Sequence, residues 1–152
     1  MQCILTALKA ESDPMIDYFH LQRVSDFSFP VFSNGNLFLI GIGIGKRSIS
    51  NRINHFVQTI GNPPIQFINI GIAGGKHTIA EIGNLYCIHK IIDASLKKSF
   101  YPDILIKHPL EERVITTVDT EINDGGDIYN TLVDMEASEI FRVCSKIVPL
   151  QN

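Results

Sequence analysis

Two glutamates stand directly after apolar, strand-like segments of the sequence. Glu11 follows the run Cys3–Leu8, and Glu136 follows the run Ile128–Met135. A carboxylate in such a place can act as a general base that activates a water molecule. It can also accept hydrogen bonds from two neighbouring hydroxyl groups, as a sugar presents them. A plainer interpretation stays open, because the helix dipole alone favours an acidic residue where a helix starts.

Two glycine-rich segments also follow strand-like runs. They are "GIGIGKRS", Gly41 to Ser48, and "FINIGIAGG", Phe67 to Gly75. The first is not a Walker phosphate loop, because Arg47 stands where a serine or threonine is required, and no glycine follows Gly43 at the distance that a dinucleotide fingerprint needs. What remains is either a tight turn or a glycine turn whose free N–H groups bind an anion or a polar ligand.

The second glycine segment removes side chains at the end of a strand, where a ligand would need bare backbone. Open α/β sheets bind ligands at the carboxyl ends of their strands. If the strands are parallel, Glu11, Glu136 and the two glycine segments meet at one edge of the sheet. The sequence therefore predicts a pocket there, although a tight turn would explain the glycines equally well.

Apolar periodicity predicts three helices. The first begins at Asp13-Pro14, read as a cap followed by a first-turn proline, and ends near Phe19. The second, Ser48–Ile60, carries its apolar residues on one face and stops at Gly61. The third is Glu136–Ser145.

Short apolar runs predict strands between these helices, and Asn34-Gly35 predicts a hairpin turn. Residues 93–109 show little periodicity and are interpreted as a loop, and Asp124-Gly125-Gly126 as a turn. The alternation of strands and helices favours an α/β fold with three layers, a central mixed β-sheet flanked by helices. The expected strands are Cys3–Leu8, Val31–Ser33, Leu37–Ile42, Ile65–Ile70, Leu85–Ile92, Arg113–Val118 and Ile128–Met135.

Length and composition narrow the function classes. The chain has 152 residues, of which 45% are hydrophobic, so a single domain, 1–152, with a packed core is expected. The net charge of −3 argues against a dedicated nucleic-acid binder. No apolar run is long enough for a membrane span, and the N-terminus does not resemble a signal peptide, so a cytoplasmic protein is expected. The three cysteines and five histidines are scattered, which predicts neither disulfides nor a metal site.

Four segments, taken together and in this order, resemble one family. They are "ILTALKAES" from Ile4, "GIGK" from Gly43, "INIGIAGG" from Ile68 and "VDMEAS" from Val133. The sequence is similar to the nucleoside phosphorylases and nucleosidases, and most of all to the 5'-methylthioadenosine/S-adenosylhomocysteine nucleosidases, over nearly the whole chain. The resemblance implies a phosphorylase/hydrolase-like fold, a small-molecule nucleoside as ligand, no cofactor and a homo-oligomer, usually a dimer.

The resemblance also implies roles for individual residues. Glu11 matches the glutamate that activates the attacking water, and Glu136 matches the carboxylate that binds the ribose hydroxyls. Asn69 stands where related phosphorylases have a phosphate-binding arginine, which favours water over phosphate, although Arg47 leaves an alternative anion site open. The residues expected to line the substrate site are Gly43, Ile72, Ala73, Gly74, Ile122, Met135 and Glu136.

The sequence also departs from the family pattern. The family's catalytic aspartate lies on the strand after the "VDMEAS" helix, and this sequence ends at Asn152, where that strand would begin, so we expect a domain truncated at its C-terminal edge. Ile72 replaces a serine, and Glu121 replaces an aromatic residue. The leading prediction is hydrolysis of a purine nucleoside. The alternatives are a catalytically impaired nucleoside-binding or regulatory homologue, binding of something else on the same scaffold, and an enzyme whose acid is Asp119, Asp124 or Asp127.

Overall fold

The computed structural model describes residues 1–64, 66–104, 107–122 and 128–148, which form two compact units. The first unit comprises Met1–Ile72 and the chain from Arg142 onward, and the second comprises Ala73–Phe141. The three helices are α1 (Lys9–Tyr18), α2 (Ile49–Ile60) and α3 (Ala137–Ile147), and the boundary between the units falls within α3. No helix in the described ranges is both long and apolar enough to cross a membrane.

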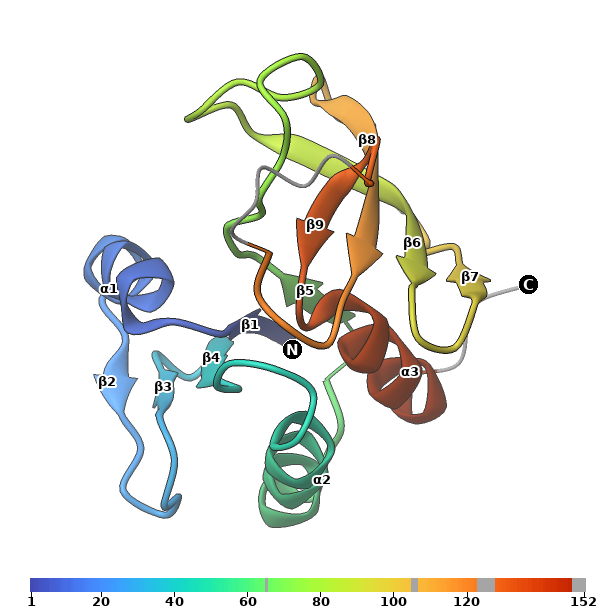
Figure 1. The fold of residues 1–152 in the computed structure, drawn as a ribbon. Helices are drawn as coiled ribbons and strands as arrows, with labels where there is room; N and C mark the ends of the chain where they lie inside the picture. Colours follow the sequence, from blue (N-terminus) through green and yellow to red (C-terminus); the bar gives the residue numbers. More distant parts are fainter. Residues whose placement is uncertain (65, 105–106, 123–127, 149–152) are drawn as a thin grey trace. The chain divides into compact units, whose positions relative to one another are not determined.

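The first unit is built on a five-stranded mixed sheet (Figure 1). The strand order is β2-β3-β4-β1-β5, with β1 parallel to both β4 and β5, and with the short strands β2 and β3 antiparallel at one side. The carboxyl ends of β1, β4 and β5 therefore lie at the same edge. The strand bounds are β1 Gln2–Thr6, β2 Gln22–Arg23, β3 Val31–Ser33, β4 Leu37–Gly41 and β5 Gln66–Asn69.

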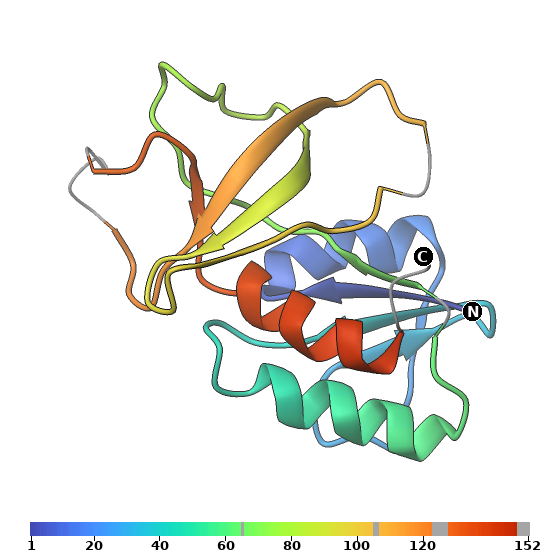
Figure 2. The same ribbon diagram turned by 90° about the vertical axis from the view of Figure 1, so that its right-hand side faces the viewer.

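Helices α1 and α2 cover opposite faces of this sheet (Figure 2). Met15 and Ile16 of α1 pack against the buried cluster that contains Leu39. The preceding residue, Phe38, points to the other face, since side chains alternate along a strand. Its ring contacts that of Phe56 on α2 edge-on, with 5.2 Å between the ring centroids. The apolar face predicted for this second helix is thus the face that it buries.

Helix α1 begins earlier than the sequence predicted. The expected start at Asp13-Pro14 is wrong, because the helix starts at Lys9 and Pro14 lies within it. The reason is Glu11, whose side-chain Oε2 accepts hydrogen bonds from the backbone N–H groups of Ala7 (2.8 Å) and Leu8 (2.9 Å). These bonds satisfy amide groups that the first turn leaves without a partner. The proline therefore does not set the helix start.

The hairpin turn and the helix end that the sequence predicted in the first unit are confirmed. Asn34-Gly35 forms the hairpin between β3 and β4, with Gly35 at a φ of +93°. Helix α2 ends at Gly61, which adopts the left-handed conformation with a φ of +70°. Both glycines occupy backbone conformations that other residues adopt at a cost.

The second unit carries a four-stranded mixed sheet of order β7-β6-β8-β9 (Figure 1). Strands β6, β8 and β9 are parallel, and β7 is antiparallel to β6. The segment 93–109, predicted as a loop, thus contains a short edge strand. The predicted α/β class with mixed sheets and flanking helices is confirmed, and hydrogen bonding distributes the strands over two sheets. The strand bounds are β6 Tyr86–Asp93, β7 Lys98–Phe100, β8 Glu111–Thr117 and β9 Leu132–Asp134.

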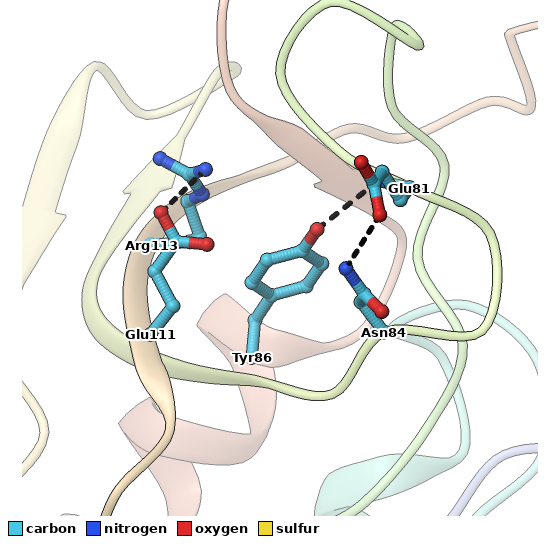
Figure 3. A network of polar contacts seen from close by, with 5 residues as sticks. All are labelled: Glu81, Asn84, Tyr86, Glu111 and Arg113. Atoms are coloured by element: carbon cyan, nitrogen blue, oxygen red, sulfur yellow. Dashed lines mark hydrogen bonds and ion pairs between the residues drawn. The ribbon is translucent and has the colours of Figure 1, made fainter.

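A group of polar contacts holds the amino ends of β6 and β8 (Figure 3). The Tyr86 hydroxyl accepts a hydrogen bond of 3.0 Å from the backbone N–H of Glu81, and the Asn84 side chain donates to the Glu81 carboxylate over 3.1 Å. The Arg113 guanidinium lies 5.5 Å from the centre of the Tyr86 ring and 2.7 Å from Glu111 Oε1. These contacts fasten the connection that enters β6, at the end of the strand opposite to the "VDMEAS" segment.

Candidate active site

The carboxyl ends of β1, β4 and β5 bring three of the predicted features together in the first unit. The residues that follow these strands include Glu11 after β1, Gly43 after β4 and Gly71-Ile72 after β5. Register pairing of Leu5 with Asn69 fixes the ends of β1 and β5 side by side. This is the edge at which open α/β sheets bind ligands.

Glu11 forms the centre of this edge, and its carboxylate is held by three backbone N–H groups. Oε2 accepts from Ala7 and Leu8, and Oε1 accepts from Ile72 over 3.0 Å. A carboxylate offers about four lone-pair positions, so these bonds leave capacity for a further donor such as water. The side chain is half-buried and fixed in direction. It is therefore positioned to accept a proton from a molecule at this edge.

The glycine at position 71 allows this contact. A Cβ atom added to Gly71 would lie 3.2 Å from Glu11 Oε1, tighter than most carbon contacts. The bare backbone that the sequence indicated is thus needed for the approach of the carboxylate to the Ile72 amide. The side chain of Ile72 itself is 74% exposed and packs little against the protein.

The first glycine segment is held by a residue that the sequence did not single out. Arg52 Nη1 donates a 2.7 Å hydrogen bond to the Gly41 carbonyl, and Ser48 Oγ donates a 2.6 Å bond to the Ile42 carbonyl. Both side chains occupy the space that a Cβ atom on Gly43 would enter, and the φ of Gly43 is +81°. The sequence contained a signal for this pair, because Ser48 and Arg52 are four residues apart and therefore share one face of the predicted helix. Arg47, the alternative anion-binding residue, is exposed.

Replacing Gly43 with alanine is expected to destabilise the protein more than the same change at Gly45. Both glycines have positive φ values, +81° and +74°, so both variants incur the roughly 1–2 kcal/mol of a left-handed alanine. At Gly43 the new Cβ also meets Ser48 Oγ at 3.1 Å and Arg52 Nη1 at 3.2 Å, whereas a Cβ built on Gly45 meets no atom beyond its chain neighbours within 4 Å. We therefore expect Gly43→Ala to lose about 1 kcal/mol more of its free energy of unfolding than Gly45→Ala, because the new Cβ strains the hydrogen bond of the charged Arg52 side chain.

Urea unfolding of the two variants measures this difference directly. Gly45→Ala is the matched control for the backbone term. Equal unfolding midpoints for the two variants would contradict the role assigned to the contacts of Gly43.

In the second unit, the predicted residues Ala73, Gly74, Met135 and Glu136 lie at the carboxyl end of β9. Gly74 and Val133 exchange two backbone hydrogen bonds of 2.9 and 2.8 Å, which place the second glycine segment beside β9. Glu136 is half-buried and precedes α3, and its Oε2 accepts a 3.3 Å hydrogen bond from the Met135 N–H. The turn that carries Met135 and Glu136 thus follows directly on the strand that pairs with the glycine-rich backbone.

Two of the remaining predicted residues follow β8. Ile122 is half-buried and Asp119 is exposed, both beyond the end of β8. Asp124 and Asp127, together with the predicted turn around Gly125, lie outside the described residues. Glu11 belongs to the first unit and Glu136 to the second. Convergence of these two carboxylates on one ligand therefore stays a prediction.

The sequence reading missed the polar side chains at the ends of the strands of the second unit. Asp93, Thr117 and Asp134 are the last residues of β6, β8 and β9, and all three contact the turn or the first residues of α3. One signal could have found Asp134, since an aspartate commonly accepts hydrogen bonds from backbone N–H groups two or three residues further on, as in an Asx turn before a helix.

Cys3 and Cys144 offer no nucleophile to this site. Burial raises the pKa of the Cys144 thiol to about 12, and burial together with the neighbouring Cys144 raises the pKa of Cys3 well above its ordinary value. Both thiols are therefore protonated at neutral pH and unreactive. In the part of the chain that the structure describes, no group of three or more histidine, cysteine, aspartate or glutamate side chains is arranged to hold a metal ion.

Comparison with known proteins places the fold among nucleosidases. No family model matches the sequence, and none of the curated proteins does. The structure is similar to the 5'-methylthioadenosine/S-adenosylhomocysteine nucleosidase (MTAN) of Chlamydia trachomatis bound to methylthioadenosine (MTA). The identity is 19%, the TM-score is 0.75, and the match covers 97% of this chain and 75% of that one.

Two further solved structures show the same similarity. The Campylobacter jejuni 5'-methylthioadenosine/S-adenosylhomocysteine nucleosidase has 18% identity, a TM-score of 0.76 and coverage of 95% and 79%. A futalosine hydrolase mutant of Helicobacter pylori has 16% identity, a TM-score of 0.70 and coverage of 95% and 83%. The chain therefore shares the fold of the 5'-methylthioadenosine/S-adenosylhomocysteine nucleosidases, as the sequence resemblance predicted.

Proposed function

We propose that this protein hydrolyses the N-glycosidic bond of a purine nucleoside of the methylthioadenosine or S-adenosylhomocysteine type. The observation that carries the proposal is the fold shared with nucleosidases over 95–97% of the chain, with TM-scores of 0.75 and 0.76 for two of them. Fold alone does not fix function, so a nucleosidase also requires a site with suitable chemistry. The carboxylate of Glu11 at the edge of the parallel strands supplies it.

In the proposed reaction, Glu11 accepts a proton from a water molecule as the water oxygen forms a bond to C1' of the ribose. The bond between C1' and the purine nitrogen breaks through an oxocarbenium-like transition state, and the base leaves with the electron pair. The leaving base must gain a proton, and Asp119 is the candidate acid among the described residues. Glu136 accepts hydrogen bonds from the ribose hydroxyls, and Ala73 and Gly74 contribute backbone to the ligand site.

A second function has an observation of its own. The Glu11 carboxylate caps α1 by accepting from the N–H groups of Ala7 and Leu8, and it accepts a third bond from the Ile72 N–H after β5, and this cap would be useful without any chemistry. A protein that binds a nucleoside without cleaving it would keep this cap, and the exposed Ile72 in place of a serine is compatible with that reading. A binding or regulatory protein is therefore the alternative. The protein is proposed to act in the cytoplasm as a homodimer under either reading.

Release of free base in the absence of phosphate tests the proposal. The purified protein is incubated with methylthioadenosine, S-adenosylhomocysteine, adenosine and inosine, each with and without phosphate, and the bases are separated by chromatography. We expect base from at least one nucleoside without phosphate. Release that requires phosphate would instead indicate a phosphorylase. Binding without release from any of the four would favour the nucleoside-binding protein.

A further inference from the structure

The turn that carries Glu136 is fastened by the carboxylate of Asp134. Asp134 Oδ2 accepts hydrogen bonds from the N–H of Glu136 (3.1 Å) and from the N–H of Ala137 (2.6 Å). Ala137 is the first residue of α3 and Glu136 immediately precedes it, and N–H groups at a helix start have no acceptor within the helix. The side chain of Asp134 therefore caps α3 and fixes the backbone of the residue proposed to bind ribose.

Thr117 links the same turn to the neighbouring strand. Its hydroxyl donates a 2.7 Å hydrogen bond to Asp134 Oδ1 and accepts a 3.0 Å bond from the N–H of Ser138. Thr117 is fully buried, and its position in β8 is the register partner of Asp134 in β9. One hydroxyl thus joins the end of a strand to both sides of the turn.

Asp93 adds a third strand to this arrangement. It is 2% exposed, ends β6 as the register partner of Thr117, and accepts a 2.6 Å hydrogen bond from Ser138 Oγ. Its other oxygen accepts from the hydroxyl of Ser95 over 2.8 Å. Hydrogen bonds between buried groups are strong, and a buried polar group without a partner lowers the stability of the protein. Three parallel strands therefore end in polar groups that fix the first residues of α3.

We propose that Asp134 and Thr117 are positioning residues, which hold the Glu136 carboxylate where it can accept both ribose hydroxyls. The inference rests on the proposed function of Glu136. A carboxylate that accepts hydrogen bonds from two hydroxyls at once must lie in a narrow range of positions. In an active site, a displacement of about 1 Å can lower the reaction rate roughly 10²-fold. The polar strand ends thus set the recognition of the ribose diol as well as the stability of the helix.

Replacement of Thr117 by valine tests this role. Valine keeps the shape of threonine but neither donates to Asp134 nor accepts from Ser138. Thr117→Ser is the matched control, because it keeps the hydroxyl. The probes are a C-nucleoside analogue of adenosine, whose carbon–carbon glycosidic bond is not hydrolysed, and its 2',3'-dideoxy counterpart. Calorimetry measures both affinities for each protein, and thermal unfolding reports the folded fraction at the assay temperature.

We expect Thr117→Val to lower the ratio of the two affinities by about 10-fold, which corresponds to about 1.4 kcal/mol, because the turn that positions Glu136 loses two hydrogen bonds. Thr117→Ser keeps the hydroxyl, so its ratio stays near the wild-type value. An unchanged ratio in folded Thr117→Val overturns the inference and leaves the proposed function intact. Equal weakening of both probes indicates a purely structural role and also overturns it. Should Thr117→Val not fold, Asp134→Asn is measured in its place. A wild-type protein that binds neither probe refutes the proposed function, and the inference with it.

Discussion

Glu11→Gln is expected to lower base release by roughly 10²–10⁴-fold, the usual contribution of a positioned general base. Glutamine has nearly the same shape as glutamate but cannot take a proton from water at neutral pH. Affinity for the uncleavable C-nucleoside is expected to stay within a few-fold of the wild-type value, because Glu11 acts on the nucleophile and is not proposed to bind the sugar. Turnover and binding therefore separate in this variant.

The same substitution also has a structural cost that must be distinguished from lost catalysis. Glu11 accepts hydrogen bonds from three backbone N–H groups, whereas glutamine has only one acceptor oxygen. The NH₂ group of glutamine then faces a backbone N–H group, and because both are donors, no hydrogen bond forms between them. We expect this to lower the free energy of unfolding by about 1–2 kcal/mol. Ser12→Ala is the matched control, since Ser12 is buried in the same helical turn and bonds to Thr6 Oγ1 and the Leu8 carbonyl.

Ser12→Ala is expected to be destabilised by a similar amount and to keep its turnover, because the carboxylate remains. Base release by Glu11→Gln at the wild-type rate would remove Glu11 from the mechanism. Loss of turnover in both variants would trace the effect to the distorted helix start. Loss in Glu11→Gln alone, with retained binding, is the result that the general-base role requires.

Much of the fold was readable from local signals in the sequence. Helix α2 and the hairpin at Asn34-Gly35 depend on residues close together in the chain, namely an apolar face, a terminal glycine and a two-residue turn. Where a distant or side-chain contact decides the outcome, local signals fail. The start of α1 is set by the Glu11 side chain rather than by Pro14, and the edge strands β2 and β7 are too short to leave a periodic pattern.

The candidate site was predictable in its residue types but not in its contacts. The glycine at position 71 suggested a close approach, yet the partner that approaches it is Glu11, 61 residues from Ile72 along the chain. The role of Thr117 is equally hidden, because a threonine at the end of a β-rich segment is common. Only the parallel register of β8 and β9 brings it to Asp134. Tertiary pairing therefore determines which polar residues act together.

Glu136→Ala is expected to weaken binding of the uncleavable adenosine C-nucleoside by roughly 10²–10⁴-fold. Each hydrogen bond from a sugar hydroxyl to a charged acceptor contributes about 1.5–3 kcal/mol, and the carboxylate is proposed to accept two of them. The 2',3'-dideoxy analogue lacks both hydroxyls, so the substitution should scarcely change its affinity. The loss is thus expected to depend on the ligand and not only on the protein.

Glu139→Ala is the matched control for this experiment. Glu139 lies in the first turn of α3, so its removal takes a similar negative charge away from the same helix start. We expect it to bind the C-nucleoside nearly as the wild type does. If Glu136→Ala binds the ribonucleoside with wild-type affinity, the site assignment fails. If it weakens both ligands equally, Glu136 supports the fold of the turn and the ribose is bound elsewhere. Only a loss confined to the ligand with both hydroxyls identifies Glu136 as the residue that recognises ribose.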